Sequence, residues 1–84
     1  MDKLTFDTLC NKLNEKQIGC RVSLYKDEIE IELGFFYPDD LFFQVYDIAV
    51  SLGIQDKIEV CADSAGGPSP ISQKVINGGP KSYF

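Results

Sequence analysis

The chain has no histidine among its 84 residues. This excludes serine-histidine and cysteine-histidine nucleophile pairs and imidazole metal ligands, and it removes the commonest general base. The phosphate-binding patterns GxxxxGK(S/T) and GxGxxG are absent too, and both Gly-Gly-Pro segments place proline where a backbone amide donor would be needed. The sequence therefore predicts a protein without enzymatic activity and without a bound cofactor.

The acidic side chains do not form a metal-binding pattern. Asp39 and Asp40 stand where a helix is expected to begin, and acids in that position stabilise the helix dipole without any catalytic role. The acids of residues 27–32 lack the loop spacing and the glycine of a calcium-binding loop. We therefore expect no bound metal.

The three cysteines, Cys10, Cys20 and Cys61, are odd in number and have no CxxC spacing. This pattern favours buried free thiols over a disulfide framework or a zinc site. No apolar run approaches the roughly 20 residues of a membrane-spanning helix, and residues 1–7 are too polar for a signal peptide. The sequence predicts a cytoplasmic location without membrane contact.

The chain is short and acidic. Its 44% hydrophobic and 25% charged residues are typical of one small globular domain. Residues 1–63 hold all 13 acidic and six of the eight basic residues, a net charge of −7, whereas residues 64–84 have a net charge of +2. We predict an acidic α+β domain over residues 1–63 and a Gly/Pro-rich segment over 64–84, packed on the domain or on a partner. Because the acidic body repels phosphate, the expected partner is a larger protein or nucleoprotein complex with a basic surface, not nucleic acid itself.

The first predicted element is an amphipathic helix over Phe6–Gln17. Its apolar positions follow helical spacing: Phe6, Leu9, Cys10 and Leu13. Thr5 is the expected N-cap, and Gly19 is expected to supply the left-handed residue after the helix.

A β-hairpin follows, in which acids alternate with apolar residues over residues 28–33. Side chains alternate between the two faces of a strand, so one face of this strand enters a core and the other carries a row of glutamates. A two-residue turn at Lys26-Asp27 sets the register, because a shift by one residue would bury the charges. The expected partners are Leu24 with Ile29, Val22 with Ile31, Cys20 with Leu33, Tyr25 with Glu28, Ser23 with Glu30, and Arg21 with Glu32.

The second predicted helix spans about Asp40–Leu52 and ends at Gly53. It is apolar around most of its circumference, so it must be covered on more than one side. Either the first helix and the sheet cover it, or Phe43, Tyr46 and Val50 form an exposed patch that invites a partner.

A third strand is expected over residues 56–61, with Glu59 on the same face as the glutamate row. The predicted fold is a small α-β-β-α-β sandwich, with two helices on one face of a mainly antiparallel three-stranded sheet. For the C-terminal segment two alternatives stand: a fourth edge strand around Ser72–Ile76, or a segment ordered by assembly.

The glutamate row leads to the main functional hypothesis. Alternate residues of a strand lie roughly 6.6–6.8 Å apart, a spacing similar in scale to that of successive phosphates on a nucleic-acid strand. A basic partner groove can accept such a row in place of nucleic acid, and the expected contacts are Glu28, Glu30, Glu32 and Glu59. The competing interpretation is an ordinary solvated face, partly neutralised by Arg21 and Lys57.

In size, acidity, lack of catalytic groups and compact α+β form, the chain is similar in type to small phage-encoded inhibitors of host defence systems, including anti-CRISPR proteins. This similarity implies a viral, non-catalytic inhibitor or adaptor that covers a functional surface of a larger complex. Two alternatives remain open. One is a small-ligand-sequestering domain, and the other is a homodimer or complex subunit whose apolar interface comprises Phe43, Tyr46, Val50, Tyr83 and Phe84.

Overall fold

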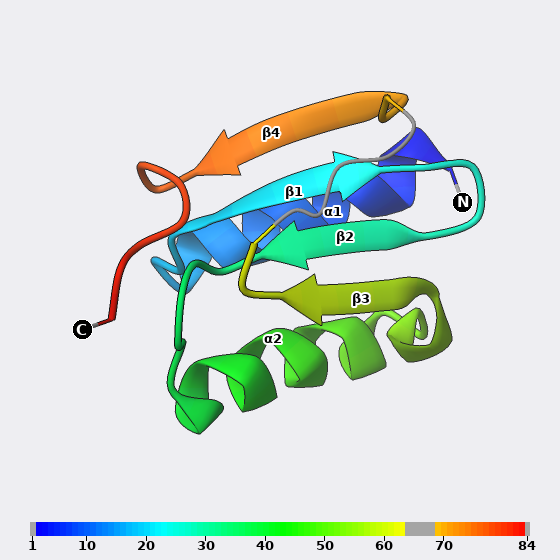
Figure 1. Ribbon diagram of the computed structural model, residues 1–84. Coiled ribbons are helices and arrows are strands. Elements are labelled where there is room, and N and C mark those ends of the chain that lie inside the picture. Colours follow the sequence, from blue (N-terminus) through cyan, green and yellow to red (C-terminus); the bar gives the residue numbers. More distant parts are fainter. Residues whose placement is uncertain (1, 64–68, 84) are drawn as a thin grey trace.

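The computed structural model describes residues 2–63 and 69–83, and it is an α+β fold with two helices and a four-stranded mixed sheet (Figure 1). The fold class predicted from the sequence is confirmed. The elements in chain order are α1 (Lys3–Glu15), β1 (Cys20–Leu24), β2 (Ile29–Glu32), α2 (Asp39–Ser51), the 3-10 turn η1 (Gln55–Lys57), β3 (Ile58–Cys61) and β4 (Ser72–Ile76).

The sheet has the strand order β3-β2-β1-β4. β1 is antiparallel to both β2 and β4, whereas β3 runs parallel to β2, its neighbour. The hairpin register is confirmed from Arg21 opposite Glu32 to Leu24 opposite Ile29, and the Tyr25 amide donates to the Glu28 carbonyl oxygen at 2.8 Å. The fourth edge strand over Ser72–Ile76 is also present.

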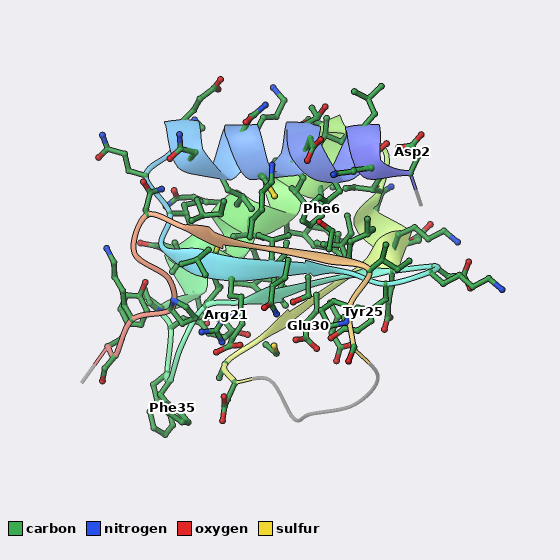
Figure 2. The ribbon with its side chains drawn as sticks, turned by 90° about the horizontal axis from the view of Figure 1, so that it is seen from above. Asp2, Phe6, Arg21, Tyr25, Glu30 and Phe35 are labelled. Atoms are coloured by element: carbon green, nitrogen blue, oxygen red, sulfur yellow. The ribbon has the colours of Figure 1, made fainter. Side chains whose placement is uncertain are left out.

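Both helices lie on one face of the sheet, and the core fills the space between the two layers (Figures 1 and 2). No helix of residues 2–63 and 69–83 lies over the opposite face. This asymmetry follows from the alternation in the strands, because only one face of the hairpin is apolar. The buried side chains of the core include Phe6, Leu9 and Leu13 from α1, Val22, Ile29, Ile31 and Leu33 from the hairpin, and Val45, Ile48 and Ala49 from α2.

The N-terminus of α1 differs from the expectation. The helix begins at Lys3 and its N-cap is Asp2, so the assignment of Thr5 as N-cap was wrong. The Asp2 carboxylate accepts a hydrogen bond from the Thr5 amide at 2.8 Å, which satisfies one of the free donors of the first turn. The apolar spacing starts only at Phe6, so it could not reveal this polar first turn.

The C-terminus of α1 differs as well. Gln17, not Gly19, adopts the left-handed conformation, with a φ of 59°. The Gln17 amide donates to Asn14 at 3.0 Å and the Ile18 amide to Leu13 at 3.1 Å, so the helix ends in a Schellman motif around a non-glycine residue. α2 ends at Ser51, one residue before the predicted Leu52, which is its C-cap, and Gly53 follows with a φ of 70°, as expected for the residue that closes the helix.

β3 is shorter than the expected strand over residues 56–61. Its first residues belong to η1, because the Lys57 amide donates to the Ile54 carbonyl oxygen at 2.8 Å and closes a turn. Ile58 is the first residue of β3. The strand is therefore four residues long and forms one edge of the sheet.

The C-terminal segment packs on the body of the protein through backbone contacts. After β4 it passes Gly34, where the Lys81 amide donates to the Leu33 carbonyl oxygen at 3.2 Å. A Cβ atom at Gly34 would overlap the Lys81 carbonyl oxygen, and a Cβ at Gly19 would lie 2.8 Å from the Gly79 oxygen. Gly19 is therefore needed for this close approach and not for ending the helix.

A candidate protein-binding face

The face of the sheet opposite the two helices carries the polar half of the strand alternation. In Figure 2 Arg21, Tyr25 and Glu30 project from the sheet on the side opposite α1. The strand register adds the other members of this face: Ser23, Glu32, Glu59, Cys61, Gln73 and Val75. Ser23 is buried, and its hydroxyl accepts a hydrogen bond from Gln73 at 2.9 Å.

Like charges meet on this face. Glu30 on β2 and Glu59 on β3 are direct register partners, and Glu59 is exposed whereas Glu30 is half-buried. Glu28, directly before β2, is exposed. Within residues 2–63 and 69–83, none of these three carboxylates forms an ion pair. Carboxylates placed directly opposite on neighbouring strands repel each other, so this arrangement costs the fold stability.

Glu32 behaves differently from the other glutamates of the row. Its side chain is only 9% exposed, and its Oε1 atom lies 3.0 Å from Nη1 of Arg21. β2 is an inner strand, and Arg21 and Cys61 flank Glu32 in the register. The sequence placed Glu32 opposite Arg21, but the depth of its burial was not apparent from the alternation. We call Glu28, Glu30, Glu32 and Glu59 together the acidic face.

Cys61 lies within the electrostatic influence of the acidic face. Burial, assisted by four nearby carboxylates, raises the pKa of the Cys61 thiol to about 11; the four acids are Glu30, Glu32, Glu59 and Asp63. Asp63 is therefore a further member of this charge cluster, and sequence reasoning missed it because it follows the end of β3. Cys10 and Cys20 are buried free thiols, as predicted, while Cys61 is half-buried.

The pKa of the Cys61 thiol reports the electrostatic effect of the carboxylates on this face. The double substitution Glu30→Gln/Glu59→Gln is expected to lower the pKa of Cys61, because two of the four carboxylates that disfavour the thiolate lose their charge. The pKa stays above the ordinary thiol value, since burial is the larger cause. Iodoacetamide labelling across alkaline pH, with the site read by peptide mass spectrometry, measures this shift. Asp7→Asn is the control, because Asp7 influences Cys10 instead. An unchanged Cys61 profile in the double variant would contradict the proximity of the charges.

The alternative apolar surface is also exposed. Phe43 is 60% exposed, and Tyr46 and Val50 accompany it on α2. We call these three residues the α2 stripe. Tyr83, from the same hypothesis, is half-buried near the end of the chain, and Phe84 lies outside the described residues.

Other kinds of site are not found in the described structure. Among residues 2–63 and 69–83, no three His, Cys, Asp or Glu side chains are grouped so as to hold a metal ion. The same part of the chain has no pocket. Neither described helix is long and apolar enough to cross a membrane.

Comparisons with known proteins found no relative: no protein-family model, no curated protein and no solved structure matches the chain. A functional inference must therefore start from the surfaces of the molecule.

Proposed function

We propose that this protein binds a basic partner protein through its acidic face and thereby occupies the surface on which that partner holds nucleic acid. The observation that carries the proposal is the register pairing of Glu30 with Glu59 on the sheet face opposite both described helices. Two adjacent carboxylates destabilise an isolated sheet. A cationic partner removes this repulsion on binding, so the cost in the free protein is offset in the complex.

The net charge of the chain also supports binding to a basic partner. Residues 1–63 carry a net charge of −7, which draws cationic protein surfaces toward this domain and repels phosphate. Glu28, directly before β2, and Glu30 within it are alternate residues, and alternate residues of a strand lie roughly 6.6–6.8 Å apart. Lys and Arg side chains arranged for phosphates can therefore meet these two carboxylates. The protein acts in this proposal as a non-catalytic inhibitor, of the type that phages encode against host defence complexes.

The double substitution Glu30→Gln/Glu59→Gln tests this proposal. We expect it to weaken partner binding by at least about tenfold, because charges on the contact surface are lost. The same variant should unfold at a slightly higher urea concentration, because the repulsion is lost too. The immobilised protein is incubated with cell extract at low salt, and bound proteins are eluted with a salt gradient and identified by mass spectrometry. Affinity for the purified partner is then measured, with competition by single- and double-stranded oligonucleotides.

Glu15→Lys is a matched control for this experiment. Glu15 is exposed at the end of α1, away from the acidic face, and its replacement changes the net charge by the same amount. This variant should retain most of the binding. A partner that the double variant binds as tightly as the wild type, or one that oligonucleotides do not displace, would refute the proposal.

A further inference from the structure

A second exposed surface lies on α2, apart from the acidic face. The helix contains three aspartates and no basic residue. Asp40 and Asp47 are exposed, and each stands three or four positions from Phe43. Residues at these separations are neighbours on a helix surface. The α2 stripe is therefore an exposed apolar strip with carboxylates along its edge.

Ring contacts hold the aromatic part of this surface in place. Tyr46 stacks on Phe42 with ring centroids 5.9 Å apart and planes inclined by 12°. Phe42 also stacks on Tyr37 at 6.5 Å, and Phe43 meets Phe42 edge to face at 5.7 Å. Side chains that are already ordered lose little conformational entropy when a partner binds them. The stripe is thus preorganised, although it is exposed.

We propose that the α2 stripe docks a basic amphipathic helix of a partner protein. The apolar side of such a helix covers Phe43, Tyr46 and Val50, which recur at i, i+3 and i+7 as helix-helix contacts require. Its lysines or arginines meet Asp40 and Asp47 and lie over the aromatic rings, where cation–π attraction adds to the ion pairs.

The negative charge of α2 favours a basic helix over a second copy of the chain as the binding partner of the α2 stripe. In a symmetric dimer through α2, the aspartates of both copies would approach each other, and no lysine or arginine of the helix would be available to neutralise them. A basic amphipathic helix can cover the apolar residues of the α2 stripe and form ion pairs with the aspartates beside them. Charge complementarity therefore favours a cationic helix over self-association.

The test uses a synthetic peptide of leucine, alanine and lysine, about five helical turns long, with the leucines on one face. A scrambled peptide of the same composition has no apolar face. Binding to the full chain is measured by fluorescence anisotropy at physiological salt. The amphipathic peptide is expected to bind at least about tenfold more tightly than the scrambled one. Phe43→Ser should remove this difference, and Asp40→Asn/Asp47→Asn should weaken binding in a salt-dependent way.

The Glu30→Gln/Glu59→Gln variant separates this inference from the proposed function, because it should bind the amphipathic peptide with unchanged affinity. If that variant loses the peptide while Phe43→Ser keeps it, the peptide binds the acidic face and the inference is wrong. Equal affinity for both peptides overturns it as well, and so does a wild-type dimer that Phe43→Ser dissociates. Val50→Ser supplies a second exposed substitution, and circular dichroism melts verify that each variant is folded.

Discussion

Replacing Gly34 with alanine is expected to destabilise the protein by about 4 kcal/mol or more, which is a large part of the stability of a small domain. Gly34 has a φ of 103°, a conformation that L-residues rarely adopt. The added methyl group would also overlap the carbonyl oxygen of Lys81, which is backbone and cannot move aside as a side chain would. Urea unfolding followed by circular dichroism measures the loss, and we expect an unfolded or barely folded variant at 37 °C.

Gly53→Ala is the matched control for this prediction. Gly53 also has a positive φ, of 70°, but within the described residues no atom beyond its chain neighbours lies within 4 Å of its Cβ position. The substitution should therefore cost only the conformational penalty of about 1 kcal/mol. If Gly34→Ala is no more harmful than Gly53→Ala, the C-terminal segment does not pack against Gly34 in solution.

The role of Gly34 illustrates which parts of the fold were predictable from the sequence. The hairpin register was predictable because every core position of β1 and β2 is apolar, from Val22 opposite Ile31 to Leu24 opposite Ile29, and a shift would bury charge. The contact of Gly34 with Lys81 joins residues far apart in the sequence. No local pattern reports such an approach, so Gly34 could be recognised only as an interruption of the alternation.

Strand order and direction were not predictable for the same reason. The alternation of Ile58, Glu59 and Val60 is identical whether β3 runs parallel or antiparallel to β2, because side-chain direction depends only on position along the strand. The parallel pairing arises because α2 carries the chain back along the sheet before β3 begins. β4 was recognisable as a short apolar piece between glycine-proline turns, but its pairing with β1 was not.

The candidate site was predictable as a face but not as a charge distribution. The alternation places Glu28, Glu30 and Glu59 on the side away from the core, where the structure has them. It does not distinguish an inner strand, where Glu32 lies enclosed by its neighbours, from an edge strand open to water. Side-chain burial depends on strand order, which is a property of the whole sheet.

Because Glu32 is enclosed, the loss of its partner Arg21 should strongly destabilise the protein. Arg21→Met is expected to destabilise the protein by about 2–3 kcal/mol, because it leaves a carboxylate that is 9% exposed without its partner. The Arg21 side chain is 39% exposed, so the pair is not fully buried, and the cost falls below that of a pair deep in a core. Methionine retains most of the aliphatic length of arginine, so lost packing contributes little. Urea unfolding at neutral pH measures the change.

The double substitution Arg21→Met/Glu32→Met should recover most of this loss, because replacing both members of this partly buried ion pair leaves no charge uncompensated. Glu32→Met alone should cost less than Arg21→Met, since the remaining guanidinium reaches water. If Arg21→Met is equally costly with and without Glu32, the ion pair contributes nothing and the loss is one of packing. The double variant keeps the net charge and leaves Glu28, Glu30 and Glu59 in place. Under the proposed function it should still bind a basic partner through Glu28, Glu30 and Glu59, which form no ion pair within residues 2–63 and 69–83.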